Sequence, residues 1–220
     1  MPFRLDLQAA GVLFDMDGTL VDSTVVVEAM WSEFAATHGL DPDVLVPASH
    51  GRQTLDTIRD FLPDRTAADQ DLLEQMFTAE EVRRTDGIVA IAGAVGLLAA
   101  LDACGAPLAV VTSASRELAT ARMRAAGVPV PHQLVTPEDI ERGKPDPEGY
   151  LLAAERIGVP IEDCVVFEDA EAGIAAAVAS GAQVVVVGGH ESERTVGLAR
   201  VPDLRGITIE SVGGGFRLRA

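Results

Sequence analysis

The sequence contains little cysteine. Only two of its 220 residues are cysteines, Cys104 and Cys164, and they form neither a CxxC pair nor a metal-ligand cluster. Both stand in apolar surroundings, so we expect them to be buried, reduced thiols. A chain of this length buries about 70% of the surface that it exposes when unfolded, and it therefore needs neither a disulfide nor a structural metal for stability.

Basic residues are also scarce. The chain has 17 of them against 34 acidic residues, which gives a formal net charge of −17. Nucleic-acid backbones and anionic membranes are bound through clustered lysines and arginines, so this balance argues against both kinds of partner. Lysine is nearly absent, because 16 of the basic residues are arginines and Lys144 is the single lysine.

Long hydrophobic runs are rare as well. Only Ala90–Val111 is apolar over enough residues to be compared with a membrane span, and it is interrupted by Asp102, Gly105 and Pro107. It is built mainly of alanine and glycine, whereas membrane spans are rich in leucine, so we predict a helix, a turn and a buried strand. The first residues, Met1–Ala10, lack the apolar centre of a signal peptide, and we therefore expect a cytoplasmic protein.

Short apolar runs, in contrast, recur along the chain and are bounded by turn residues: Gly11–Phe14, Leu108–Val111, Cys164–Phe167 and Val184–Val187. Runs that are apolar at every position are typical of parallel strands buried on both faces by helices. Helical patterns lie between them, as at Ser115–Ala126 and Glu171–Ser180, and each is followed by a glycine. This alternation predicts an α/β fold with a Rossmann-like, doubly wound parallel sheet.

Weaker signals lie outside these runs. Gln133–Val135 and Gly206–Ile209 could be edge strands of the sheet. The glycine run Gly213–Gly215 has no helix after it, so we expect a flexible tail there rather than a phosphate-binding loop.

The region after the first strand has a different character, with helical patterns and no convincing strand. One face of an amphipathic helix is marked by Val27, Met30, Trp31 and Phe34. For Trp31 we favour packing between helices over ligand binding. Similar patterns around Ile58 and Phe77 predict a second and a third helix.

These helices form an insertion directly after the first strand. We therefore predict a discontinuous α/β core, residues 1–20 and 88–220, and a helical cap, residues 21–87. The cap is expected over the C-terminal edge of the sheet, which is where open α/β sheets bind ligands.

The first strand ends in a pair of acidic residues, in the sequence Asp15-Met16-Asp17-Gly18-Thr19. Because side chains alternate along a strand, Asp15 and Asp17 point in about the same direction at its C-terminal end. Taken alone, the pair could be an acidic turn between a strand and a loop.

Three more polar clusters follow later strands. Thr112 and Ser113 end the second long strand and offer hydroxyls beside a helix N-terminus, although Ser113 or Ser115 could also simply cap that helix. Lys144 lies in a loop stiffened by two prolines. Glu168 and Asp169 end another strand, where either could also be a helix N-terminal acid.

Together the four clusters predict one polar site at the C-terminal edge of the sheet. Asp15, Asp17 and Asp169 offer the hard oxygen ligands that suit Mg²⁺. Such a group of carboxylates repels a phosphate unless positive charge compensates, which the metal and Lys144 would supply during phosphoryl transfer. A carboxylate can also act as the nucleophile and form an aspartyl-phosphate.

The ordered motifs DMDGT, VTS, GKPDPEGY and FEDAEAGIAAA resemble the four motifs of the haloacid dehalogenase superfamily and span Asp15 to Ala177. The resemblance implies that Asp15 is the nucleophile and that Asp17 is the general acid/base, which also lends its backbone carbonyl to Mg²⁺. An acid at the second position is similar to phosphotransfer members of the superfamily rather than to dehalogenases.

The resemblance also implies roles for the remaining motifs. Thr112 with the neighbouring Ser113 would bind the phosphoryl group, and which of the two makes the primary contact stays open. Lys144 would neutralise the nucleophile and the phosphate. Asp169 would ligate Mg²⁺, and Glu168 would either ligate the metal or orient its neighbours.

The inserted helices resemble the small α-helical cap of this superfamily. The segment Ser49–Thr54 and the residues after it are similar to the cap of sugar- and glycerol-phosphate phosphatases, including 2-deoxyglucose-6-phosphate phosphatases. Within it, Arg52 could bind a substrate hydroxyl or phosphate when the cap closes, or could be a surface arginine at a helix start. For His50 a structural or solvent-exposed role is favoured.

These features favour a Mg²⁺-dependent phosphatase that hydrolyses a small phosphorylated sugar or polyol through an aspartyl-phosphate. The alternative enzyme is a mutase similar to β-phosphoglucomutase. Such mutases carry a histidine shortly after the DxD strand, and Thr24–Ala29 contains none. A non-catalytic binding module with the same fold is the remaining alternative, and either a monomer or a homodimer is compatible with the sequence.

Overall fold

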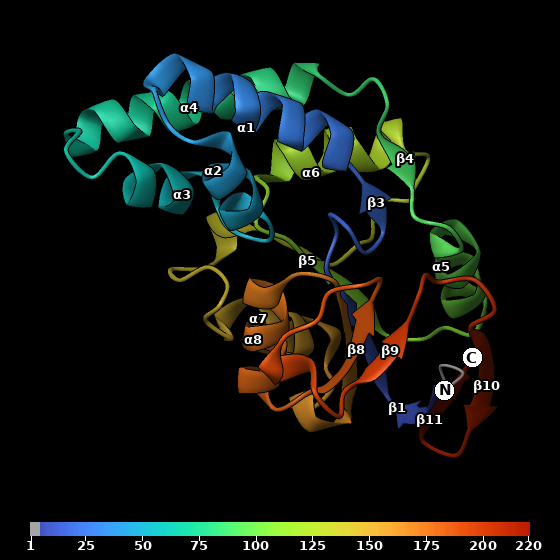
Figure 1. Ribbon diagram of the computed structural model, residues 1–220. Helices are drawn as coiled ribbons and strands as arrows, with labels where there is room; N and C mark the ends of the chain where they lie inside the picture. Colours follow the sequence, from blue (N-terminus) through green and yellow to red (C-terminus); the bar gives the residue numbers. More distant parts are fainter. Residues whose placement is uncertain (1–4) are drawn as a thin grey trace.

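The computed structural model describes residues 5–220 (Figure 1). Its strands are β1 (Asp6–Ala9), β2 (Gly11–Phe14), β3 (Val21–Asp22), β4 (Val89–Ala90), β5 (Leu108–Val111), β6 (Leu134–Val135), β7 (Cys164–Glu168), β8 (Gln183–Val187), β9 (Ala199–Val201), β10 (Thr208–Val212) and β11 (Gly215–Arg219). Its α-helices are α1 (Thr24–His38), α2 (Pro42–Ser49), α3 (Thr54–Phe61), α4 (Ala67–Arg83), α5 (Ala94–Ala103), α6 (Arg116–Ala125), α7 (Glu148–Ile157) and α8 (Glu171–Ser180). Short 3₁₀ turns are η1 (Pro137–Asp139), η2 (Ile161–Asp163) and η3 (Glu193–Thr195).

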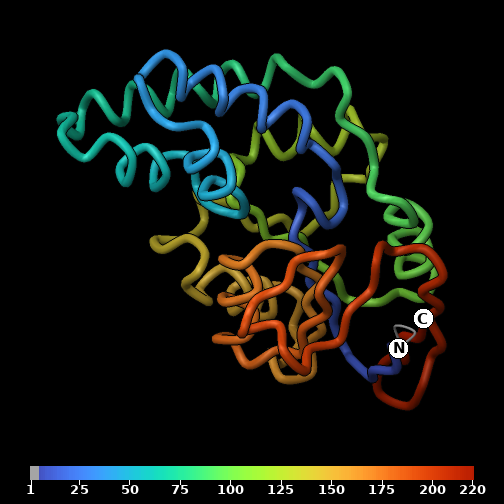
Figure 2. Tube along the Cα trace, in the orientation of Figure 1, coloured from blue at the N-terminus to red at the C-terminus, as the bar shows by residue number. Residues whose placement is uncertain are grey.

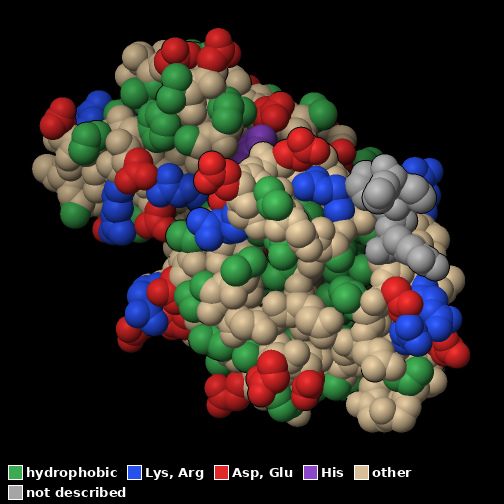
Figure 3. All heavy atoms as spheres, turned by 60° about the horizontal axis from the view of Figure 1, so that its bottom comes forward, with side chains coloured by type: hydrophobic (Ala, Val, Ile, Leu, Met, Phe, Trp, Pro, Cys, Tyr) green, Lys and Arg blue, Asp and Glu red, His purple; other side chains and the backbone are tan. Residues whose placement is uncertain are grey.

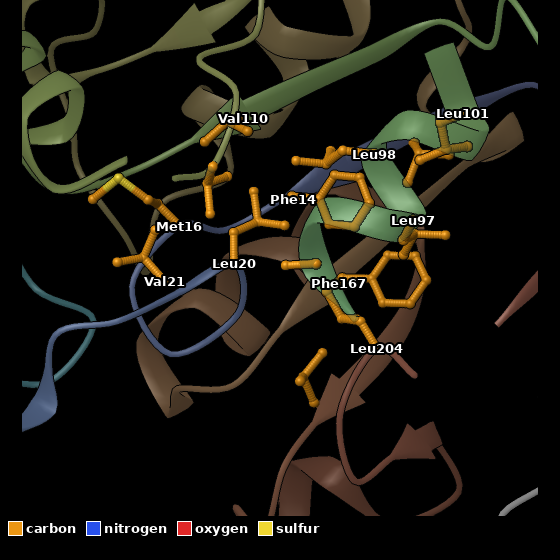
Figure 4. Close-up of a cluster of buried hydrophobic side chains, with 14 of the residues drawn as sticks. Phe14, Met16, Leu20, Val21, Leu97, Leu98, Leu101, Val110, Phe167 and Leu204 are labelled. Carbon is orange, nitrogen blue, oxygen red and sulfur yellow. The ribbon is translucent and has the colours of Figure 1, made fainter. Parts of the chain in front are cut away.

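A parallel six-stranded sheet forms the centre of the described chain, in the order β6-β5-β2-β7-β8-β9. The register places Phe14 of β2 beside Phe167 of β7, and their rings stack with centroids 5.1 Å apart. Figure 4 shows Leu97, Leu98 and Leu101 of α5 directed toward these rings. The predicted doubly wound α/β fold is confirmed.

The two faces of the sheet are covered by different helices. Val12 and Phe14 of β2 belong to the apolar cluster under α5 and α6, whereas Leu13 belongs to the cluster under α7 and α8. Adjacent residues of one strand thus enter two cores, which explains why the predicted strands are apolar at every position.

The helices α1 to α4 lie together above the carboxyl edge of the sheet (Figure 1). They share an apolar cluster in which the rings of Trp31 and Phe77 lie 4.2 Å apart. The chain enters these helices through β3 and leaves them through β4. The two strands pair antiparallel, with Val21 opposite Ala90. The four helices occupy the region expected for the cap, while the exact division at residues 20/21 and 87/88 stays a prediction.

The C-terminal segment differs from the expectation. Gly213–Gly215 is not a flexible tail, because β10 and β11 pair as a hairpin in which Gly215 already belongs to β11, with Gly214 at a φ of 86° in the turn. The strand expected at Gly206–Ile209 begins at Thr208 and belongs to this antiparallel sheet, not to the edge of the parallel one. Figure 2 shows β11 returning beside β1, its other partner.

Several further expectations can be compared with the fold. The edge strand expected near Gln133–Val135 is β6, and Ala90–Val111 contains α5, a turn and β5 as predicted. Cys164 is buried as expected. The expectation for Cys104 was wrong, because Cys104 caps the C-terminal end of α5 and is exposed there. In residues 5–220, no helix combines the length and apolar character that a membrane crossing requires; residues 1–4 of the N-terminal segment lie outside the described chain.

Candidate active site

The polar clusters expected from the sequence meet at one edge of the sheet. Asp15 directly follows β2, Thr112 directly follows β5, and Glu168 is the last residue of β7. Since β2 lies between β5 and β7, these three strands deliver their side chains to the same place, beneath α1 to α4 (Figure 1). The topology therefore brings together residues that are more than 150 positions apart in the chain.

Lys144 is buried at the centre of this edge. Its Nζ donates to Asp15 Oδ1, to Glu168 Oε1 at 2.6 Å and to the carbonyl oxygen of Val111 at 3.2 Å. Tyr150 donates its hydroxyl to the same Glu168 oxygen at 2.7 Å. Three acceptors thus use all three protons of the ammonium group and hold it in one position.

Negative charge exceeds positive charge around Lys144. Burial, together with the charges of Glu168 and Asp17, raises the pKa of Asp15 to about 8, against the opposing effect of Lys144. Burial and the charge of Asp15 also raise the pKa of Asp169 well above its usual value. Burial lowers the pKa of Lys144, but its two carboxylate partners outweigh that effect and hold the pKa above its usual range. The cluster therefore has an affinity for additional positive charge.

Asp15, Glu168 and Asp169 fit the requirements of a divalent cation. One carboxylate oxygen from each lies within 4.8 Å of the others, and three carboxylates facing one ammonium leave charge for a cation to neutralise. Both oxygens of Glu168 already accept hydrogen bonds, Oε1 from Lys144 and Tyr150 and Oε2 from the backbone N–H of Asp169 at 3.0 Å. Asp15 Oδ2 accepts none from the described residues. The carboxylate of Asp17 is not part of this group.

Two glycines allow the carboxylates to come this close. A Cβ on Gly173, in the first turn of α8, would lie 1.6 Å from Glu168 Oε1, and a Cβ on Gly18 would lie 1.9 Å from Asp169 Oδ2. Gly18 also has a φ of 83°, which other residues rarely adopt. The glycines of the DMDGT and FEDAEAG segments are therefore required for the shape of the site.

The carboxylate of Asp17 is fixed at both oxygens. Ser23 Oγ donates to Oδ1 at 2.6 Å, and Arg122 Nη1 donates to Oδ2 at 2.8 Å. Arg122 is buried on α6, and its Nη2 donates to Glu81 Oε1 of α4 at 2.5 Å. Four residues of the site were not predicted from the sequence: Ser23, Glu81, Arg122 and Tyr150. A signal for Arg122 was available, because it follows Leu118 by four residues and so lies on the buried face of its helix.

The two hydroxyl residues after β5 have different partners. Thr112 Oγ1 accepts from the backbone N–H of Ala114 at 3.1 Å, which leaves its own proton available. Ser113 Oγ donates to the carbonyl oxygen of Gly51 at 3.1 Å, in the loop between α2 and α3. Ser113 thus connects the core to the helical layer formed by α1 to α4. The helix cap, for which Ser113 and Ser115 were the two candidates, is provided by Ser115.

Arg52 and His50 line the same cleft from the helical side. Arg52 Nη2 forms an ion pair with Asp60 Oδ2 at 2.8 Å, and His50 is exposed with its Nε2 3.6 Å from Glu28. Within residues 5–220, neither Arg52 nor His50 forms a hydrogen bond with the carboxylate cluster. Substrate binding by Arg52 therefore stays a prediction.

The cleft between the sheet edge and the helices is small. It encloses a cavity of about 110 Å³ and is lined by Asp15, Asp17, Thr112, Arg122, Asp169 and neighbouring residues. Pockets that bind drug-sized ligands measure roughly 300–1,000 Å³, so this smaller space suits a small metabolite. On the molecular face shown in Figure 3, basic side chains lie in small groups next to acidic ones rather than in a continuous basic patch.

Comparison with known proteins identifies the family. The sequence model of the haloacid dehalogenase-like hydrolases matches residues 9–181, which contain every cluster described above. The chain belongs to this family. It is therefore a hydrolase, and the resemblance seen in its four motifs is confirmed.

Similar proteins include phosphatases from bacteria and yeast. Hexitol phosphatase A of Escherichia coli is 42% identical over 82% of this chain and 84% of its own length. Glycerol-1-phosphate phosphohydrolase 2 of Saccharomyces cerevisiae is 34% identical over 82% of this chain and 75% of its own length. A hydrolase from Pseudomonas syringae has a similar structure, with a TM-score of 0.78 at 28% identity over 89% of this chain and 94% of its own.

Proposed function

We propose that this hydrolase is a Mg²⁺-dependent phosphatase for small phosphorylated polyols or sugars. The observation that carries the proposal is the buried contact of Lys144 with Asp15, beside the uncompensated carboxylates of the cluster. The relatives that act on hexitol and glycerol phosphates support the polyol substrate class. The small cavity agrees with a substrate of that size.

Asp15 is the proposed nucleophile. Lys144 holds its Oδ1, so Oδ2 is the oxygen that attacks phosphorus while the ester P–O bond breaks. Asp17 donates a proton to the leaving alkoxide, which departs as the free alcohol. Asp17 then removes a proton from a water whose oxygen bonds to phosphorus while the Asp15 Oδ2–P bond breaks, which releases inorganic phosphate and restores the Asp15 carboxylate.

The other residues of the site bind charge. Asp15 and Asp169 would hold Mg²⁺ with the backbone carbonyl of Asp17, while Glu168, whose oxygens are already engaged, orients Lys144. A bound metal would supply positive charge that complements the phosphoryl oxygens and stabilises the transition state. Thr112 is proposed as the primary hydroxyl donor to the phosphate, because the Ser113 proton already binds Gly51.

The proposal is tested by measuring phosphate release from a panel of polyol, hexose, pentose and glycolate phosphates with Mg²⁺. We expect turnover of polyol or hexose phosphates that a chelator abolishes and that Asp15→Asn reduces by several orders of magnitude, with the variant still folded. Undiminished turnover by Asp15→Asn would refute the nucleophile, and activity that persists with the chelator would refute the metal.

A phosphate-shuttling mutase is the second candidate, and the absence of histidine from Thr24–Ala29 argues against it. Glucose 1-phosphate isomers with a bisphosphate primer distinguish the two functions. We expect phosphate release to exceed isomerisation, and the opposite result would favour the mutase. A cytoplasmic location and a monomeric or homodimeric state stay predictions.

A further inference from the structure

A buried arginine connects the proposed acid/base to the helical layer. Arg122 binds Asp17 with one terminal nitrogen and Glu81 with the other, and the Arg122 and Glu81 side chains are only 7% and 5% exposed. The three residues come from three elements: the loop after β2, α6 of the core and α4 of the helical layer. None of the four sequence motifs contains Arg122 or Glu81.

The ion pair between Arg122 and Glu81 is not arranged for maximum stability, because one of its polar atoms lacks a hydrogen bond. Glu81 Oε2 is buried and has no hydrogen-bond partner in residues 5–220. A buried ion pair that leaves a lone oxygen without a partner recovers its desolvation cost only in part, and in proteins such pairs are often no more stabilising than apolar residues of similar size. The arrangement therefore points to a role in positioning rather than in stability.

We propose that Arg122, anchored by Glu81, is a positioning residue that holds the Asp17 carboxylate in the orientation needed to protonate the leaving oxygen, an inference that rests on the proposed function. Ser23 and Arg122 approach opposite oxygens of Asp17, so together they fix the rotation of the carboxylate. Each carboxylate oxygen has two acceptor sites, and both therefore remain able to exchange a proton. Asp17 is also partly exposed to the cleft, where the substrate would lie.

Placing Glu81 on α4 has a consequence for the cap. The anchor of Arg122 lies in the helical layer, while Asp17 and Arg122 belong to the core side of the cleft. The orientation of Asp17 therefore depends on how α4 sits over α6. Glu81 thus couples the placement of the cap to proton transfer through its contact with Arg122.

Two substrates with different leaving groups distinguish the positioning role of Arg122 from a purely structural one. The alkoxide released from a polyol phosphate is strongly basic and needs a proton, whereas p-nitrophenolate departs without one. The value of kcat/KM includes steps only up to formation of the phosphoenzyme, so it reports this proton transfer. The ratio of kcat/KM for glycerol phosphate to that for p-nitrophenyl phosphate is also independent of the fraction of folded enzyme.

The test uses Arg122→Met and Glu81→Gln. We expect Arg122→Met to lower kcat/KM for glycerol phosphate roughly tenfold to a hundredfold, part of the full effect of a general acid, with less than about a threefold change for p-nitrophenyl phosphate. Glu81→Gln should shift the ratio in the same direction but less, because its amide oxygen can still accept from Arg122.

Arg84→Met is the matched control. Arg84 also joins two carboxylates, Glu33 and Glu80, but it lies outside the cleft. This variant should leave the ratio unchanged. An unchanged ratio in Arg122→Met, whether kcat/KM falls equally for both substrates or for neither, would overturn the positioning role. If the wild type releases phosphate from neither substrate, the proposed function fails instead.

Discussion

Lys144 is the residue on which the charge balance of the site depends. It is the only lysine in the chain, and three acceptors surround its ammonium group in a buried position. A compact ammonium can meet three converging acceptors, whereas the planar guanidinium of arginine cannot occupy the same space. This explains why a chain that otherwise uses arginine for every positive charge has lysine here.

We therefore predict that Lys144→Arg lowers kcat by about a hundredfold or more, the range seen when one donor to a transition-state charge is removed. Steady-state phosphate release measures the effect. Arg142→Lys is the control, because Arg142 is exposed two residues away and should tolerate exchange with at most a twofold change. Similar activity in both variants would contradict the role of Lys144.

Glu81 should give the protein a specific pH dependence of stability. Burial raises its pKa from 4.5 to about 7, so the folded state binds its proton more tightly than the unfolded state does. This contribution favours folding at low pH and is lost as the pH rises from about 4.5 to 7. The unfolding free energy of the wild type relative to Glu81→Gln should fall by about 3 kcal/mol across that window.

Glu80→Gln controls for the general effect of removing an acid from α4. Arg84 lowers the pKa of Glu80, so its contribution has the opposite sign, present above the unfolded pKa and lost as the pH falls through the lower, folded value. Denaturant unfolding at several pH values tests both variants. A wild-type minus Glu81→Gln difference that does not change with pH would show that Glu81 titrates normally.

The sequence was most informative where residue types and chemistry coincide. The structure brings Asp15, Thr112, Glu168 and Asp169 together as their strand-end positions predicted, and Lys144 joins them from the loop before α7. Arg122 and Glu81 escaped detection because contacts across 105 and 41 positions leave no local pattern. Their positions on buried helix faces indicate burial but cannot name a partner.

At the scale of elements, the turn from β7 into α8 is the most constrained part of the site. Gly173 lies against Glu168 with no room for a side chain. We predict that Gly173→Ala displaces Glu168, reduces activity at least tenfold and destabilises the protein by about 1–3 kcal/mol, as overpacking does.

Gly96→Ala tests whether that loss reflects the site rather than helical glycine in general. Gly96 lies in α5, and a Cβ added there would have no neighbouring atom within 4 Å, so alanine should stabilise the protein by about 0.5–1 kcal/mol and leave activity unchanged. Thermal unfolding and phosphate release measure both effects. Normal activity in Gly173→Ala would show that Glu168 can move without consequence.

Elements were predicted best where periodicity was strong. The strands β2, β5, β7 and β8 and the helices α6 and α8 follow the predicted runs closely. The helix α2 was missed because Pro42 and Pro47 interrupt its pattern, although Pro42 is well suited to a first helical position. The tail expected at Gly213–Gly215 is the turn of the hairpin β10–β11. This was missed because β11 also pairs with β1, which lies at the other end of the chain and leaves no local pattern.

For the whole molecule, the low content of basic residues and the proposed anionic substrate are compatible. A net charge of −17 spreads over the surface, whereas Lys144 and a metal would concentrate positive charge at one edge of the sheet. The fold makes this possible because parallel strands end together and the helical layer encloses the space above them. In this geometry the core supplies the charged groups of the site, and the cap encloses the space above them.

Covalent phosphorylation of Asp15 is the central claim. The most direct measurement is to quench the enzyme in acid during turnover of a ³²P-labelled polyol phosphate and to map the labelled peptide. We predict label on Asp15 in the wild type and none in Asp15→Asn. Label on any other residue, or turnover by Asp15→Asn at the wild-type rate, would contradict the mechanism.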